Sequence, residues 1–260
     1  MKLGSCTNPA NIEKAAEAGF DYLECSLSWV HGLEEAEFQA WVERVPTLPI
    51  PITKANGFAP GTLKLTGPDA KVEEWHAYLE KALSRAKKLG IKLLVLGSSA
   101  ARNIPEGWDV KTGLQQFKDF LLLAGEYAEK YDMDIALEPL RRKESNFMNL
   151  VSEGLLFSAW ANHPRINVLA DTFHMHCCRE PFSSMTFAGK YLHHVHVSSP
   201  KADESGRIYP FPGDGVDYAG IINTLKEMNY EGDVSVEAAF EDLVKDGKVA
   251  IEILRPLMEG

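Results

Sequence analysis

The sequence has few cysteines, no long hydrophobic run and no excess of basic residues. Four cysteines in 260 residues are too few for a disulfide framework, and they form no C-x-x-C pair for zinc or redox chemistry. No run of 18 apolar residues occurs and the first residues do not resemble a signal peptide, so we expect a cytoplasmic protein without a membrane span. Acidic residues outnumber basic ones by 37 to 27, which argues against nucleic acid as a partner because basic side chains bind phosphates.

Several motifs with established chemistry are also missing. The sequence contains no G-x-S-x-G, H-E-x-x-H or G-x-x-x-x-G-K-[ST] motif, which gives little support to a serine hydrolase, a metalloprotease or a nucleoside triphosphatase. The first turn between a predicted strand and helix, GSCTNP, lacks the G-x-G-x-x-G fingerprint. This absence disfavours an open, doubly wound sheet, which is the main alternative architecture.

The chain does contain a regular alternation of short apolar runs and amphipathic segments. We expect eight strands, at residues 2–5, 21–26, 51–55, 92–97, 133–138, 166–171, 193–198 and 233–237. We expect helices at residues 9–18, 33–44, 71–89, 114–130, 149–162, 217–228 and 240–258, and a less regular one at 176–191. Eight strand–helix units without a Pro/Gly/Ser-rich linker predict an α/β fold, a single (β/α)₈ TIM-barrel domain over residues 1–260.

Four successive predicted strands end on side chains that can bind a metal. These are, in order, Glu138, Asp171, His196 and Glu237. Any one of them alone would more often be a helix cap or a salt-bridge partner, but four at the carboxyl ends of neighbouring barrel strands favour a shared site. Three carboxylates and one imidazole suit Mn²⁺, Mg²⁺ or Co²⁺ better than Zn²⁺. Strand alternation also places His194 on the same face as His196, with His193 on the other.

These segments resemble a known family. The motifs that carry the resemblance are LEPLRRKESNFMN (137–149), LADTFHM (169–175), HVHV (194–197) and VSVE (234–237). They are similar to motifs of the xylose-isomerase-like barrel superfamily, in the branch that contains D-tagatose 3-epimerase and D-psicose 3-epimerase. The resemblance implies an isomerase with one divalent metal ion, Mn²⁺ before Mg²⁺ or Co²⁺, held by the four strand-end residues. Glu138 and Glu237 would also be the catalytic acid/base pair on opposite faces of a ketose.

The resemblance also implies how a sugar or keto-sugar substrate would be bound. Glu144 and His174 match positions that contact the substrate. The family's arginine, about six residues after the strand-seven histidine, is replaced by Ala202, and its nearest match is Arg207 in a longer loop. Analogy with the family further predicts a homodimer or homotetramer.

Two aromatic residues are candidate walls of the sugar pocket because of the loops in which they lie. Phe58 follows the third predicted strand and Trp108 follows the fourth. In the same loop as Trp108, Arg102 is expected to brace the loop or to contact an anionic group of the substrate. The carboxyl ends of the strands are where barrels form their active sites, so an aromatic ring there either lines the ligand pocket or packs locally.

Several reactions remain open for such a site. Removing the proton next to a ketone gives an enediolate, and returning it to the other face or to the neighbouring carbon gives epimerisation or aldose–ketose isomerisation. An inosose dehydratase-like lyase on the same metal site is the alternative. A DNA-repair enzyme of the endonuclease IV type would need more metal ligands, and a non-catalytic sugar-binding barrel would not need both glutamates.

Overall fold

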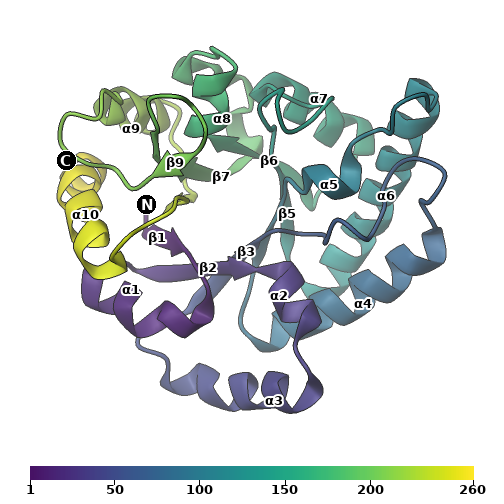
Figure 1. Cartoon of the computed structure of the whole chain (residues 1–260), viewed down its shortest axis with the longest axis horizontal. Helices are drawn as coiled ribbons and strands as arrows, with labels where there is room; N and C mark the ends of the chain where they lie inside the picture. The colour runs from purple at the N-terminus through teal and green to yellow at the C-terminus, as the bar shows by residue number, and fades with distance from the viewer.

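The computed structural model describes residues 1–260, whose strands close into a barrel of eight parallel strands (Figure 1). The barrel strands are β1 (Leu3–Cys6), β2 (Tyr22–Ser26), β3 (Ile52–Asn56), β4 (Leu93–Leu96), β5 (Asp134–Leu137), β6 (Ile166–Asp171), β7 (Leu192–Val197) and β10 (Asp233–Val236). They pair in chain order, and β10 closes the barrel between β7 and β1. The predicted (β/α)₈ barrel is confirmed, and each strand agrees with its predicted range to within a residue at either end.

Helices surround the barrel and supply the second layer. They are α1 (Ile12–Ala18), α2 (Leu27–Gly32), α3 (Glu35–Arg44), α4 (Val72–Lys88), α5 (Ser99–Arg102), α6 (Val110–Tyr131), α7 (Val151–Ala161), α8 (Thr172–Cys177), α9 (Tyr218–Glu227) and α10 (Leu243–Glu259). Four short 3₁₀ segments lie at Pro9–Asn11, Val45–Thr47, Phe182–Phe187 and Gly189–Tyr191. The helix α4 ends just before Gly90, whose φ of 89° is a left-handed conformation that glycine adopts without strain.

Some local elements differ from the sequence-based expectation. The segment 176–191 is not one helix, because α8 ends at Cys177 and only 3₁₀ turns follow it. The short helices α2 and α5 were not predicted. Neither was the antiparallel pair β8 (Ser199–Pro200) and β9 (Arg207–Ile208), which lies inside the long loop after β7. All of these elements are too short to show a clear hydrophobic period.

The interior of the barrel has an apolar side and a polar side. On the side of β4, β5 and β6 the buried interior cluster consists of Leu93, Val95, Ala136 and Leu169. On the side of β2, β7 and β10 the buried side chains include Glu24, His194, His196 and Ser235. A much larger apolar cluster of 57 buried residues forms the main core. The polar half of the interior leads directly to the carboxyl ends of β7 and β10.

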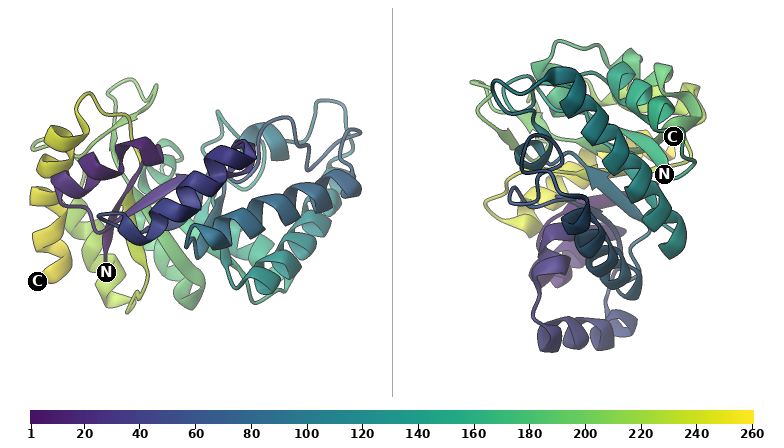
Figure 2. Two further views of the ribbon diagram at one scale, coloured as in Figure 1. Left: turned by 90° about the horizontal axis from the view of Figure 1, so that it is seen from below. Right: turned by 90° about the vertical axis from the view of Figure 1, so that its right-hand side faces the viewer.

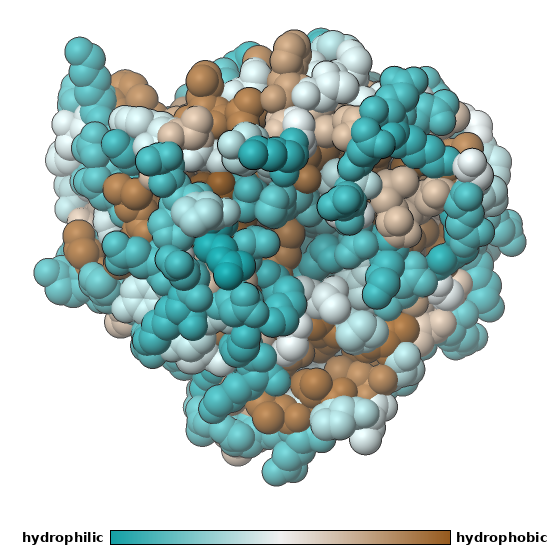
Figure 3. Space-filling model, turned by 180° about the vertical axis from the view of Figure 1, so that it is seen from behind, coloured by the Kyte–Doolittle hydropathy of each residue, from teal (hydrophilic) through white to brown (hydrophobic).

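The outer layer is uneven. Figure 2 shows that α3 lies outside the ring of helices, whereas α4 and α6 lie side by side along the barrel. The face behind that of Figure 1 is mostly hydrophilic, with hydrophobic groups in separate patches (Figure 3). None of the helices combines the length and the apolar character needed to cross a membrane.

Candidate active site

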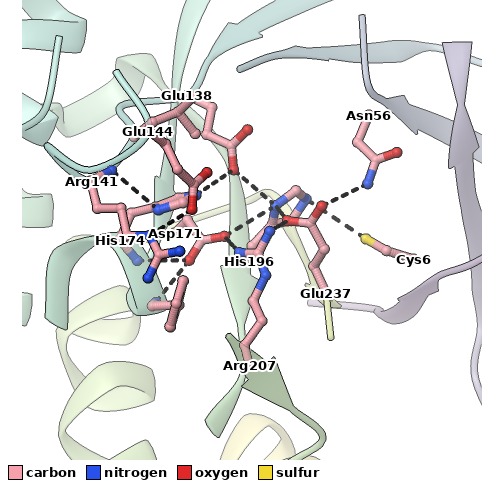
Figure 4. A network of polar contacts seen from close by, with 12 residues as sticks. Cys6, Asn56, Glu138, Arg141, Glu144, Asp171, His174, His196, Arg207 and Glu237 are labelled. Atoms are coloured by element: carbon pink, nitrogen blue, oxygen red, sulfur yellow. Dashed lines mark hydrogen bonds and ion pairs between the residues drawn. The ribbon is translucent and has the colours of Figure 1, made fainter. Parts of the chain in front are cut away.

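The four strand-end residues converge at the carboxyl end of the barrel. Asp171 is the last residue of β6, His196 lies in β7, and Glu138 and Glu237 directly follow β5 and β10. One potential ligand atom from each lies within 4.8 Å of the others (Figure 4). Adjacent parallel strands therefore bring together residues that are up to 99 positions apart in the sequence.

Asp171 combines a structural role with a place in the cluster. Its Oδ1 accepts hydrogen bonds from the backbone N–H groups of Phe173 (2.8 Å) and His174 (3.2 Å) at the start of α8. Its Oδ2 faces the cluster and lies 3.7 Å from His196 Nδ1. Capping a helix with one oxygen thus leaves the other directed at the site.

The position of Glu138 depends on a glycine and on a buried arginine. A Cβ atom at Gly97, just after β4, would overlap the Glu138 carboxylate, so only glycine leaves room for it there. Arg102 is fully buried, and its Nη1 donates to the backbone oxygen of Glu138 at 3.1 Å while its Nη2 donates to that of Met148 at 3.3 Å. Arg102 therefore braces the loop after β5, which is the first of the two roles expected for it.

The orientation of His196 is fixed by a residue that sequence reasoning missed. Glu24, in β2, is fully buried and its Oε1 accepts a hydrogen bond from His196 Nε2 at 2.9 Å. Its Oε2 lies 2.8 Å from His194 Nε2 and accepts from the Ser235 hydroxyl at 2.7 Å. Because Nε2 of His196 donates to a carboxylate, Nδ1 is the nitrogen left to face the cluster.

Three polar atoms of the cluster are buried without a hydrogen-bond partner. They are Glu138 Oε1, His196 Nδ1 and Glu237 Oε2. A buried polar group without a hydrogen bond costs about 1–3 kcal/mol, more if charged, so three in one place favour a ligand that satisfies them. Within the chain, Glu237 Oε2 has ion-pair contacts of 2.8 Å with His196 Nδ1 and Arg207 Nη2. Oxygen and nitrogen donors of this kind fit a divalent cation. The cluster is therefore suited to a metal ion in its chemistry as well as in its spacing.

The two glutamates have opposite pKa shifts. Burial and the charge of Glu237 raise the pKa of Glu138 above its ordinary value. Burial acts in the same direction on Glu237, but the positive charges of Arg207 and His196 outweigh it and lower the pKa of Glu237. Two carboxylates whose environments separate their pKa values are the usual arrangement for an acid and a base in one site.

Two of the expected substrate contacts lie beside the cluster. His174 is buried, its Nδ1 accepts from the backbone N–H of Arg141 at 3.2 Å, and its Nε2 lies 3.8 Å from Glu138 Oε1. Glu144 lies farther out, with its side chain 36% exposed and its Oε1 paired with Arg141 Nε at 2.5 Å. Figure 4 shows both residues on the Glu138 side of the cluster.

Arg207 reaches the cluster from β9. Its Nη1 pairs with Asp171 Oδ2, and its Nη2 lies 2.8 Å from Glu237 Oε2 (Figure 4). The guanidinium also lies 5.3 Å from the ring centroid of Phe173. The longer loop thus delivers an arginine to the site, although six residues after the strand-seven histidine the sequence has alanine.

A cavity of about 510 Å³ opens beside Glu237 and Arg207, within the size range of small-molecule sites. Its aromatic wall is Trp29, and it is also lined by Asn56, whose Nδ2 donates to Glu237 Oε1 at 2.9 Å. The sequence could have indicated both residues, because Trp29 lies just after β2 and Asn56 is the last residue of β3, where barrel active sites form.

The two aromatic residues expected to line the sugar pocket do not line this cavity. Phe58 is fully buried in the main core and packs edge-to-face on Phe120 of α6 at 6.0 Å between ring centroids. The expectation that it forms a pocket wall is therefore wrong, because its ring turns outward to the helical layer. Trp108 is half-buried, and its indole Nε1 is buried without a partner. It is absent from the lining of this cavity.

Fold and site together define this chain as a (β/α)₈ barrel with an acid–histidine cluster at its carboxyl end. It belongs to the xylose isomerase-like TIM barrel family, whose model matches residues 12–257. The resemblance inferred from the motifs is thereby confirmed.

Two named relatives illustrate the likeness. The D-psicose 3-epimerase of Agrobacterium fabrum is 27% identical over 235 residues, which cover 87% of this chain and 77% of that protein. The solved structure of D-psicose 3-epimerase from Clostridium cellulolyticum H10 with D-tagatose has a TM-score of 0.85 and 22% identity, and 99% of each chain is covered. The structural likeness shows the fold, and the relatives confirm the predicted class of enzyme, an isomerase.

Proposed function

We propose that this protein is a divalent-metal-dependent ketose 3-epimerase. The observation that carries the proposal is the convergence of two glutamates, an aspartate and a histidine, three of whose facing atoms are buried and make no hydrogen bond. Relatives named D-psicose 3-epimerase and L-ribulose 3-epimerase support the same reaction class. The substrate is a sugar with a ketone next to the carbon that is inverted.

In this proposal Glu138, Asp171, His196 and Glu237 hold one metal ion, with Mn²⁺ preferred over Mg²⁺ and Co²⁺, and Zn²⁺ less favoured. When bound, the ion would polarise the ketone and stabilise the charge of an enediolate. Glu24 keeps His196 in the tautomer that presents Nδ1, and Gly97 leaves space for the Glu138 carboxylate.

The two glutamates move the proton. Epimerisation requires that a proton leave one face of the carbon and return to the other, and one carboxylate cannot reach both faces. Glu138 and Glu237 follow strands that are separated in the barrel by β6 and β7, so they approach the cluster from different sides. In the proposed reaction one of them removes the proton while the other, already protonated, supplies one to the opposite face.

The remaining side chains bind and orient the sugar. His174 and Glu144 lie on the Glu138 side, whereas Arg207 and Trp29 lie on the side of the cavity. Polar groups at both ends would fix the direction in which the ketose lies, with Trp29 as an apolar wall. A homodimer or homotetramer is proposed by analogy with the family.

Two measurements test the proposal. The protein should bind about one Mn²⁺ per chain, and Asp171→Ala should lose it. With D-psicose, D-tagatose, D-fructose and L-ribulose as a panel in D₂O, turnover should place deuterium on the inverted carbon. Full metal binding in Asp171→Ala would contradict the ligand set, and turnover without label would contradict the two-carboxylate proton transfer.

A further inference from the structure

Arg207 occupies an unusual place for a substrate-binding arginine. It pairs with the Oδ2 of Asp171 and lies against the Oε2 of Glu237. These are the same two oxygens that, with Glu138 Oε1 and His196 Nδ1, face the centre of the cluster. The guanidinium therefore uses two of the four positions that the proposed metal ion would need.

The electrostatics of the cluster require a cation at this place. Three carboxylates lie around His196, and an uncompensated charge in a buried site is strongly unfavourable. The guanidinium of Arg207, a permanent cation, contacts both Asp171 Oδ2 and Glu237 Oε2. Arg207 supplies positive charge to the carboxylates from within the chain.

The hairpin that carries Arg207 is held independently of that contact. The backbone oxygen of Glu204 accepts from Arg141 Nη1 at 2.5 Å, and the backbone oxygen of Arg207 accepts from the N–H of Ala239 at 3.2 Å. Lys201 N–H also donates to the Gly206 oxygen at 2.9 Å. The side chain of Arg207 is thus free to leave the carboxylates while β8 and β9 remain in place.

We propose that Arg207 is an internal counter-cation that competes with the divalent metal ion for Asp171 and Glu237. Metal binding displaces the guanidinium from the two carboxylates toward the adjoining cavity, which Arg207 already lines. The free energy needed to separate Arg207 from Asp171 and Glu237 therefore lowers the affinity for the metal ion. The inference rests on the proposed metal site but concerns how tightly and how exchangeably the ion is held.

The test is calorimetric titration of Mn²⁺ into chelator-treated protein. Arg207→Gln removes the competing charge and should bind Mn²⁺ at least about 10-fold more tightly than the wild type, because close ion pairs in partly buried sites are strong. Arg207→Lys keeps a charge but not the bidentate contact, so its Mn²⁺ affinity should increase less than that of Arg207→Gln. It replaces Arg207→Gln in the test if the glutamine variant does not fold. Arg141→Gln is the matched control, since it removes a hydrogen bond to the same hairpin but no contact with the cluster. Its Mn²⁺ affinity should stay within about 3-fold of that of the wild type.

A second readout is thermal stability. Without metal, Arg207→Gln should melt below the wild type because it leaves the carboxylates uncompensated, and excess Mn²⁺ should remove most of that difference. Unchanged or weaker Mn²⁺ binding in Arg207→Gln would overturn the inference alone, as would an equal gain in Arg141→Gln. Absence of Mn²⁺ binding in the wild type and all variants would instead overturn the proposed metal site, and the inference with it.

Discussion

The imidazole of His196 belongs to two groups of polar side chains, which differ in how fully their hydrogen bonds are made. We call the group around Glu24 the lower network and the group of Glu138, Asp171 and Glu237 the upper cluster. Below it, Glu24 has a partner for both oxygens, and Tyr22 and Ser235 continue the hydrogen bonding at 2.8 Å. Above it, Glu138 Oε1 and His196 Nδ1 make no hydrogen bond, and the oxygens of Asp171 and Glu237 that face His196 are paired with the guanidinium of Arg207. Folding alone can retain the lower network, whereas the carboxylates of the upper cluster depend on the charge of Arg207 or of a bound metal ion. The two nitrogens of His196 therefore face different surroundings: Nε2 belongs to a structural hydrogen-bond network, and Nδ1 faces the candidate metal site.

The largest expected effect comes from altering the upper cluster's two glutamates. Glu138→Gln and Glu237→Gln should each lower kcat by at least ~100-fold, because glutamine keeps an oxygen ligand but cannot transfer the proton. The measurement is steady-state turnover of a ketose with Mn²⁺, together with calorimetry to show that metal still binds. Near-normal turnover in both variants would leave the two residues as ligands only.

A change in the lower network should act on the upper one through His196. Glu24→Gln removes the charge that accepts from His196 Nε2, so we expect Mn²⁺ affinity to fall by about 10- to 100-fold. The free energy of unfolding should also fall by about 3 kcal/mol, since two buried histidines lose their carboxylate.

The control for Glu24 is Ser235→Ala, which removes one hydrogen bond to Glu24 but leaves its contact with His196. It should cost about 1 kcal/mol of stability and leave metal affinity nearly unchanged. If the two variants lose metal affinity equally, Glu24 acts by general packing and not by orienting the imidazole.

A substitution at the rim should have a smaller effect on turnover. Glu144 is partly exposed and pairs with Arg141 rather than with the cluster. Glu144→Gln should therefore raise KM and lower kcat/KM by about 10-fold, with metal affinity unchanged. A loss of metal affinity in this variant would instead connect Glu144 to the cluster.

The parts of the molecule that were predictable are those with a local pattern. Consecutive apolar residues gave the strands, and the barrel geometry then placed Glu138, Asp171, His196 and Glu237 at one rim. Glu138, Asp171 and Glu237 end or directly follow an apolar run, and His196 lies between two valines, which is why they could be found from the sequence.

The missed parts depend on contacts between distant segments. Glu24 precedes His196 by 172 residues and lies inside a strand, so no spacing rule connects the pair. Phe58 was misassigned because a loop residue's direction is set by the neighbouring helices, here by Phe120. Arg207 was recognised as a match, but its pairing with Asp171 follows from the fold of the β8–β9 hairpin.

The smallest effect is expected at a carboxylate outside both networks. Glu180 is half-buried and accepts from the N–H of Val151 at the start of α7, through Oε1 at 3.1 Å and Oε2 at 3.3 Å. Burial, with a contribution from the charge of Glu153, raises the pKa of Glu180 to about 7. Between the ordinary glutamate pKa and 7, the folded chain therefore holds a proton at Glu180 that the unfolded chain releases.

It follows that this group's contribution to stability is lost as the pH rises through that window, and the loss is complete above pH 7. Glu180→Gln has no proton to lose, so the unfolding free energy of the wild type relative to this variant should be higher at pH 5 than at pH 8. We expect a change below about 2 kcal/mol, because solvent screens a half-exposed carboxylate. Urea denaturation at the two pH values measures it, and Glu153→Gln should reduce the same change by removing a neighbouring charge. A difference between wild type and Glu180→Gln that is independent of pH would show that Glu180 is ionised throughout, with the helix-capping hydrogen bonds outweighing its burial.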